Sequence, residues 1–232
     1  MRTNLVFAVL ALSGSLATRA SPQDVVRNMA ACGGDEPTYS LRQQMAGCTA
    51  VVAMRSTTPR DLADALSNRG VIYGKLNQYA RAIADLDQAI RLQPNSASAI
   101  YNRGMVYSKQ GRNTEAIAAY DQAIRLRPND PEKFYSRGIV YGTLKQYSRA
   151  VTDLDRAIRL KPNFAEAFNA RGIAHDELKQ YTQAIADYDN AIRFKPDFAK
   201  AFYFRGIVEA KLGRGDQAAA DMARAKALDP RF

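Results

Sequence analysis

Few side chains in this sequence have the chemistry for catalysis or metal binding. There is one histidine, His175, and there are two cysteines, Cys32 and Cys48. Two cysteines and one distant histidine are too few ligands for a zinc site. The glycines are single rather than gathered in a phosphate-binding loop. We therefore expect no catalytic residues, no metal site, no cofactor and no enzymatic activity.

His175 itself belongs to a recurring position. Tyr73, Tyr107 and Tyr141 stand at the same position of a 34-residue period, so we interpret His175 as a packing residue rather than a general base. The period is marked by five Arg-Gly pairs, each followed by a proline at a constant offset: Arg69-Gly70, Arg103-Gly104, Arg137-Gly138, Arg171-Gly172 and Arg205-Gly206, with Pro94, Pro128, Pro162, Pro196 and Pro230. Repeats of this length predict a stacked array of helices.

Each unit contains two amphipathic segments, and residues 63–96 illustrate the pattern. Apolar residues recur at helical spacing on both sides of Asn77-Gln78, which we interpret as the turn between two helices. Pro94 ends the second helix because proline cannot continue one. Gly70 lies in the middle of the first helix, where glycine costs about 1 kcal/mol relative to alanine. Its recurrence in all five units predicts a close approach of the paired helices.

These positions resemble the signature of the tetratricopeptide repeat (TPR). In the first unit the matching residues are Leu66, Gly70, Tyr73, Ala82, Leu86, Ala89 and Pro94, and the other four units match over about residues 61–232. His175 and Glu209 depart from the pattern by replacing its tyrosine. The resemblance implies an all-α fold, a right-handed α-solenoid of five helix pairs that binds other polypeptides. The units would span 63–96, 97–130, 131–164, 165–198 and 199–232.

The first twenty residues have the layout of a secretory signal peptide. Arg2 precedes an apolar run from Leu5 to Leu12, and small residues follow up to Ala17 or Ala20, after either of which cleavage could occur. The run is too short for a permanent membrane-spanning helix. An uncleaved anchor and a mitochondrial presequence are the alternatives. We expect residues 1–20 to be removed and the protein to be exported, to the periplasm or outside the cell.

Residues 21–60 fit the repeat poorly and predict a degenerate helical cap. Pro22 to Ala31 can form one helix with Ser21 as its N-cap, and Tyr39 to Met54 can form a second. We expect a loop from Cys32 to Pro37 and a joint from Ser56 to Pro59. In an exported chain, Cys32 and Cys48 favour one disulfide, with two buried free thiols as the alternative.

The chain is basic, with a formal net charge of +10. Because the arginines are spread along every unit rather than gathered in one run, we do not expect a nucleic-acid partner. Many are expected to pair with the aspartate four residues earlier, as in Asp87–Arg91, Asp121–Arg125, Asp155–Arg159 and Asp189–Arg193. The arginines of the Arg-Gly pairs are expected to bind Asp85, Asp153, Asp187 and Asp221. Arg103 needs another partner, because Ala119 takes the corresponding position.

The resemblance also places the binding surface. In TPR arrays the first helix of each pair lines a concave groove. By spacing, the groove residues expected here are Asn68, Lys75, Tyr101, Asn102, Lys109, Tyr135, Asn169 and Tyr203. Each tyrosine could instead pack against the neighbouring unit. Ser67, Val71, Glu132 and Ser136 replace the residues of a carboxylate-binding clamp, so chaperone C-terminal tails are not the predicted ligand.

These observations predict a non-enzymatic scaffold that binds a protein or peptide in its concave groove. One alternative is a binder of anionic polymer or membrane surface, driven by the net charge. Another is a self-assembling structural protein. The oligomeric state and the partner stay open.

Overall fold

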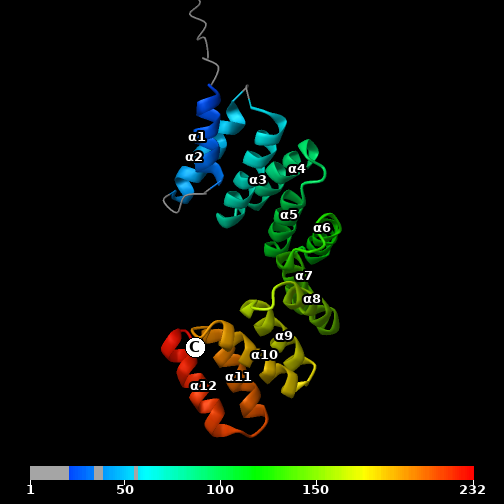
Figure 1. Cartoon of the computed structure of the whole chain (residues 1–232), viewed down its shortest axis with the longest axis vertical. Coiled ribbons are helices and arrows are strands. Elements are labelled where there is room, and N and C mark those ends of the chain that lie inside the picture. Colours follow the sequence, from blue (N-terminus) through cyan, green and yellow to red (C-terminus); the bar gives the residue numbers. More distant parts are fainter. Residues whose placement is uncertain (1–20, 34–38, 55–56) are drawn as a thin grey trace, which may run out of the picture.

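The computed structural model describes residues 21–33, 39–54 and 57–232, and this part of the chain is an array of twelve helices (Figure 1). The helices are α1 Pro22–Gly33, α2 Leu41–Ala53, α3 Pro59–Lys75, α4 Tyr79–Leu92, α5 Ala97–Lys109, α6 Asn113–Leu126, α7 Pro131–Thr143, α8 Tyr147–Leu160, α9 Ala165–Glu177, α10 Tyr181–Phe194, α11 Ala199–Lys211 and α12 Gly215–Leu228. The predicted all-α solenoid is confirmed. The predicted signal peptide lies outside the described residues, as do residues 34–38 and 55–56.

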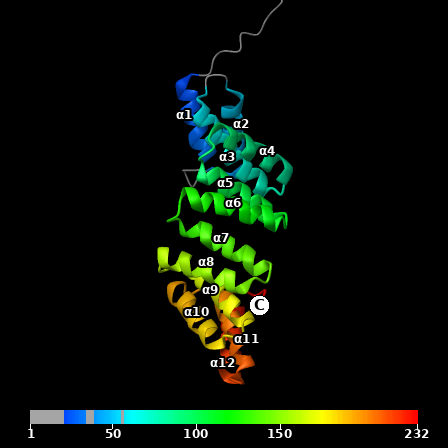
Figure 2. The same cartoon turned by 90° about the vertical axis from the view of Figure 1, so that its right-hand side faces the viewer.

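The array has an inner and an outer layer. Each helix packs against the next in sequence, and the first helix of each pair also contacts the first helix of the following pair: α3 meets α5, α5 meets α7, and so on. The second helices α4, α6, α8, α10 and α12 make no such contacts with one another. The first helices therefore line the inner, concave side, and α4, α6 and α8 lie along the outer edge (Figure 1). Seen from the side, successive pairs stack along the long axis (Figure 2).

The glycine of each Arg-Gly pair lies where the two helices of a unit touch. A Cβ added at Gly70 would come within 2.7 Å of Leu86 Cγ, and one at Gly172 would come within 2.7 Å of the Tyr188 ring. Those distances are too short for any real side chain. The close approach of the paired helices, which the recurring glycine predicted, is therefore confirmed.

The turn inside every unit uses one backbone conformation. The second residue after the first helix, directly following the C-cap, has a positive φ in all five units: Asn77 (58°), Gly111 (72°), Lys145 (57°), Lys179 (59°) and Gly213 (76°). The next residue donates its N–H to a carbonyl five residues earlier, as Gln146 does to Tyr141 (2.8 Å). This is the Schellman arrangement, which satisfies the last carbonyls of a helix.

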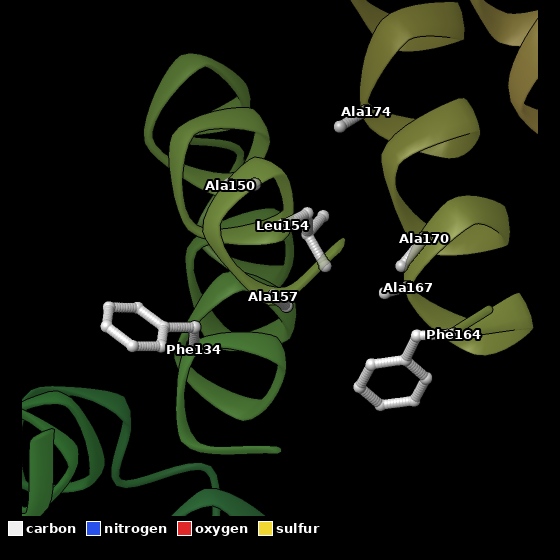
Figure 3. Packing of buried hydrophobic residues seen from close by; sticks show 8 residues of the cluster. All are labelled: Phe134, Ala150, Leu154, Ala157, Phe164, Ala167, Ala170 and Ala174. Atoms are coloured by element: carbon white, nitrogen blue, oxygen red, sulfur yellow. The ribbon is translucent and has the colours of Figure 1, made fainter. Parts of the chain in front are cut away.

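The core is a series of small clusters, each shared by three or four successive helices. In one of them, Ala150, Leu154 and Ala157 of α8 face Ala167, Ala170 and Ala174 of α9 (Figure 3). Alanine dominates this contact, so the helix axes can approach closely. Since each pair can bury its apolar face only against its neighbours, the repeats stabilise one another.

The N-terminal cap packs as one more helix pair. Ser21 and Asp24 exchange hydrogen bonds at the start of α1 (3.0 and 3.2 Å), and Ser40 and Gln43 form a capping box at the start of α2. Two predictions about this region are wrong. Cys32 and Gly33 belong to α1 rather than to a loop, and α3 begins at Pro59, inside the predicted joint, because Thr58 caps it and proline suits the first turn.

Cys32 and Cys48 are joined by a disulfide in the structure. Both residues are buried, and they pack with Val51 of α2 against Ala65 and Ile72 of α3. The bond therefore links the two helices of the cap at the surface that covers the first unit.

The arginines of the Arg-Gly pairs pair within the scaffold, as expected. Arg69, Arg137, Arg171 and Arg205 bind Asp85, Asp153, Asp187 and Asp221 of their own units through two hydrogen bonds each. Arg103, which lacks such an aspartate, donates to Asp87 of the preceding unit (2.8 Å).

The predicted aspartate–arginine pairs four residues apart are wrong. Each of these aspartates instead binds the Arg-Gly arginine of the next unit, and the pairs are Asp87–Arg103, Asp121–Arg137, Asp155–Arg171 and Asp189–Arg205. These carboxylates lie on the side of the outer helix that faces the next first helix, where a half-buried guanidinium is a stronger partner than an exposed one. Three of these arginines, Arg137, Arg171 and Arg205, thus bind carboxylates of two units at once. We call the five arginines of the Arg-Gly pairs, together with the aspartates that they bind, the arginine ladder.

His175 and Glu209, which replace the repeated tyrosine, both find polar partners. His175 Nδ1 lies 2.6 Å from Gln180 Oε1, and its Nε2 lies 3.7 Å from Asp187. Glu209 accepts a hydrogen bond from Arg214 (3.0 Å). Each therefore belongs to the packing of its own unit.

Within the described ranges, no helix is long and apolar enough to span a membrane. The same residues hold no group of three or more side chains arranged to bind a metal ion.

Candidate binding groove

The concave side is hollowed over the last three units. The hollow has a volume of about 710 Å³ and is lined mainly by α7, α9 and α11, with contributions from α8, the α10–α11 connection and the end of the chain from Leu228. Its apolar wall comes from residues of these first helices together with the last residue: Tyr135, Ile139, Ile173, Phe204 and Phe232. Ile139 is 39% exposed, which is high for a large apolar side chain on a helix. The hollow is therefore an apolar surface open to a ligand.

Charged side chains stand along one edge of the hollow. Lys195 donates a hydrogen bond to Glu166 (3.1 Å), and Lys200 and Asp229 lie nearby in the same lining. Burial alone would raise the pKa of Glu166, but its backbone hydrogen bond and the charges of Lys195 and Lys161 outweigh that effect and lower the pKa. Glu166 is therefore ionised at neutral pH, and the edge presents both signs of charge.

Asn169 is the most buried polar residue in the lining of the hollow. The residue is 7% exposed, and its Oδ1 has no hydrogen-bond partner among the described residues. An unpaired buried amide oxygen costs about 1–3 kcal/mol. A small rotation of the amide would let it accept an N–H from a ligand and recover that energy. An amide carries both a donor and an acceptor, which are the two groups of a peptide bond.

The predicted groove residues separate into two groups. Tyr135 and Asn169 line the hollow. Tyr101 and Asn102 instead connect neighbouring units, because Tyr101 Oη lies 2.8 Å from Ser136 Oγ and Asn102 donates to Ser67 Oγ (3.3 Å). For Tyr101, which also packs on Tyr120 at 5.5 Å, the alternative of packing between units describes the structure.

The other predicted residues lie outside the hollow's lining. Tyr203 packs on Phe232, with ring centroids 4.8 Å apart, and so supports the wall from behind. Asn68 is half-buried on α3, and Lys75 and Lys109 are exposed at the ends of α3 and α5. These three are distant from the hollow along the array, so the eight residues do not form one site.

Several lining residues are missing from the predicted set. Two of them, Lys195 and Phe198, come from the connection between units four and five, and two others, Asp229 and Phe232, come from the segment after α12. A sequence signal existed for one of them: Phe164 and Phe198 occupy the same position of the 34-residue period, just before a first helix. The remaining residues enter the hollow only because the array curves.

Comparison with known protein families identifies the repeat directly. Three models match: two described as tetratricopeptide repeat, over residues 67–131 and 104–175, and one described as TPR repeat, over residues 177–213. No curated protein sequence matches the chain.

Solved structures share the fold. MamA from Desulfovibrio magneticus RS-1 superposes with a TM-score of 0.67 at 22% identity, covering 75% of this chain and 96% of MamA. A tetratricopeptide repeat protein from Parabacteroides merdae gives 0.71 at 18% identity, over 88% of this chain and 80% of its own. YrrB, described as a TPR protein with an unusual peptide-binding site, gives 0.60 at 27% identity, over 72% of this chain and 87% of its own. With its 34-residue units and this architecture, the chain belongs to the tetratricopeptide repeat family.

Proposed function

We propose that this protein is a non-enzymatic scaffold that binds an extended polypeptide segment in the hollow over units three to five. The observation that carries the proposal is the buried Asn169, whose Oδ1 has no partner in the described chain and lies within an apolar lining. TPR proteins serve as protein-binding scaffolds, and the solved structure of YrrB is described as having a peptide-binding site.

The lining indicates what the segment would contain. Ile139, Ile173 and Phe204 offer a surface for one or two apolar side chains of the ligand. The amide of Asn169 would hold the adjacent peptide bond. Lys200 and the Glu166–Lys195 pair would fix the direction of a ligand that carries charge at one end.

The test starts with selection of binders for the full chain from a random peptide library, followed by fluorescence anisotropy with one selected peptide. Asn169→Ala should weaken binding about tenfold, the equivalent of one buried hydrogen bond. The same substitution should leave the stability of the free protein unchanged or higher, because it removes an unpaired buried group. Tyr101→Phe, which removes a hydroxyl outside the hollow, is the matched control and should bind normally.

Two outcomes would contradict the proposal. Selected peptides whose binding is insensitive to both Asn169→Ala and Ile173→Asp would place the ligand elsewhere. Equal weakening by Tyr101→Phe would show that general loosening of the array, and not the hollow, controls affinity.

We further propose that the protein works in an exported compartment. The signal-like first twenty residues and the Cys32–Cys48 bond in the structure support this. Fractionation of cells that make the full chain should recover a shortened protein outside the cytoplasm, with both thiols protected from alkylation. Val9→Arg, which interrupts the apolar run, should retain the protein inside with free thiols. Full-length protein in the cytoplasm of the unaltered strain would overturn the proposal.

A further inference from the structure

The outer helices carry a regular row of exposed arginines. Arg91, Arg125, Arg159 and Arg193 occupy the same position near the ends of α4, α6, α8 and α10, and all four are exposed. We call these four residues the outer row. It lies on the second helices, and none of its four members lines the hollow.

The outer row lacks carboxylate partners because of the arginine ladder, and Arg193 donates instead to the amide oxygen of Asn190 (2.8 Å). The aspartate four residues before each member binds the next unit's arginine instead, as Asp155 does with Arg171 (2.6 Å). Across the described ranges, no carboxylate lies within ion-pair distance of any of the four outer-row guanidinium groups. The aspartates of these helices are thus paired within the array, and the outer-row arginines are left on the surface without a carboxylate beside them.

The imbalance extends over the whole of these four helices. Apart from the ladder aspartates, their one carboxylate is Glu115, which is paired with Arg112 (2.9 Å). Arg149 and Arg156 of α8 add to the row in unit three: Arg149 is exposed, Arg156 is partly exposed, and neither has a carboxylate partner in the described chain. Their spacing puts them on one helix face with Arg159.

Apolar side chains accompany the row. Leu126 follows Arg125 and Phe194 follows Arg193, and each of these apolar residues is 37% exposed. The guanidinium of Arg193 lies 4.6 Å from the centre of the Phe194 ring. A uniformly charged polymer would leave these apolar groups without contacts. A polypeptide that mixes acidic and apolar residues can pair with both.

We propose that the outer row is a second interaction surface, which binds an acidic polypeptide segment lying across α4, α6, α8 and α10. Carboxylates match guanidinium groups in a two-pronged geometry, and the leucine and phenylalanine take intervening apolar side chains. The outer helices do not touch one another, so this side is convex. A flexible segment can follow a convex row, whereas a flat membrane would meet only part of it.

The experiment measures binding of a fluorescein-labelled peptide of Glu-Glu-Leu repeats to the full chain by anisotropy. One variant changes all four residues of the outer row to Gln: Arg91, Arg125, Arg159 and Arg193. The matched control changes Arg42, Arg60, Arg224 and Lys226 to Gln, because these exposed cations lie off the row and the change in net charge is the same. Parallel arms use phosphatidylglycerol vesicles and inorganic polyphosphate, and circular dichroism verifies the fold of each variant.

The outer-row variant should bind the peptide at least about tenfold more weakly, while the control variant changes less than about twofold. Asn169→Ala should not affect this binding, which separates the outer row from the hollow. Equal losses of peptide affinity in the two quadruple variants would show that net charge alone controls binding, and would overturn the proposal. Absence of peptide binding would also overturn the proposal. So would vesicles or polyphosphate that bind to the outer row more tightly than the peptide does.

Discussion

Arg137 donates two hydrogen bonds of 2.7 Å to the carboxylate of Asp153 in its own unit. It also reaches Asp121, which belongs to the preceding unit. One side chain thus joins three helices, α6, α7 and α8. The hydrogen bonds to Asp153, followed by the one to Asp121, raise the pKa of Arg137 above its ordinary value despite partial burial. Units of this array are therefore held together by charge as well as by apolar contact.

The two partners of Arg137 should differ in energetic weight. The Asp153 side chain is 7% exposed, and that of Asp121 is 38% exposed. Asp153→Ala should lower the free energy of unfolding by about 3 kcal/mol, because it leaves a half-buried guanidinium with one partner. Asp121→Ala should cost less than about 1 kcal/mol, as for exposed pairs. Urea unfolding followed by circular dichroism measures both, and equal losses would refute this ranking.

The ladder has one gap that a single substitution can fill. In unit two, Ala119 takes the place of the ladder aspartate, and the Nε of Arg103 is buried without a partner in the described chain. Ala119→Asp should supply that partner and raise the melting temperature, with a gain of about 1 kcal/mol. Ala118→Asp, one residue away and exposed, should give no gain. A destabilised Ala119→Asp variant would mean that unit two has repacked around the alanine.

The turns offer a second route to higher stability. Lys145 and Lys179 have φ values of 57° and 59° at the position where two other units have glycine. Since a side chain is strained in this conformation, Lys145→Gly and Lys179→Gly should each stabilise the protein by about 0.5–1 kcal/mol. The reverse change, Gly111→Ala, should destabilise it by a similar amount or more. Thermal unfolding of the variants provides the comparison, and a loss on introducing glycine would contradict the strain argument.

Alkaline pH should unfold the array. Burial raises the pKa values of Tyr101, Tyr120, Tyr135 and Tyr188 above the ordinary 10.0. A tyrosine whose folded pKa is raised stabilises the fold fully below its unfolded pKa, and the contribution is lost as pH rises through the folded pKa. The free energy of unfolding should therefore fall above about pH 10. Absorbance at alkaline pH should show these phenols ionising together with loss of helicity, after the exposed tyrosines. Ionisation of all tyrosines in a still-folded protein would contradict this.

Much of the fold could be predicted from the sequence because its signals are local and repeated. Gly70 and its equivalents, the prolines after each unit and the helical spacing of apolar residues all report contacts within one 34-residue unit. The pairing of Arg69 with Asp85 was predictable for the same reason, since both lie in one unit at a constant separation. Each of these signals recurs in four or five units, which makes chance agreement implausible.

The relations between units were decided by the tertiary structure. Asp121 has an arginine four residues away and another sixteen away, and the sequence favours the nearer one. Helix packing instead places Asp121 against the half-buried Arg137, where the weaker solvent screening strengthens the pair. The hollow arose in the same way, because the curvature of the array brings Phe198 and Phe232 to the side chains of α7 and α9. The sequence by itself determined the unit and its count, and packing between units decided which charges were left outside and where the groove opened.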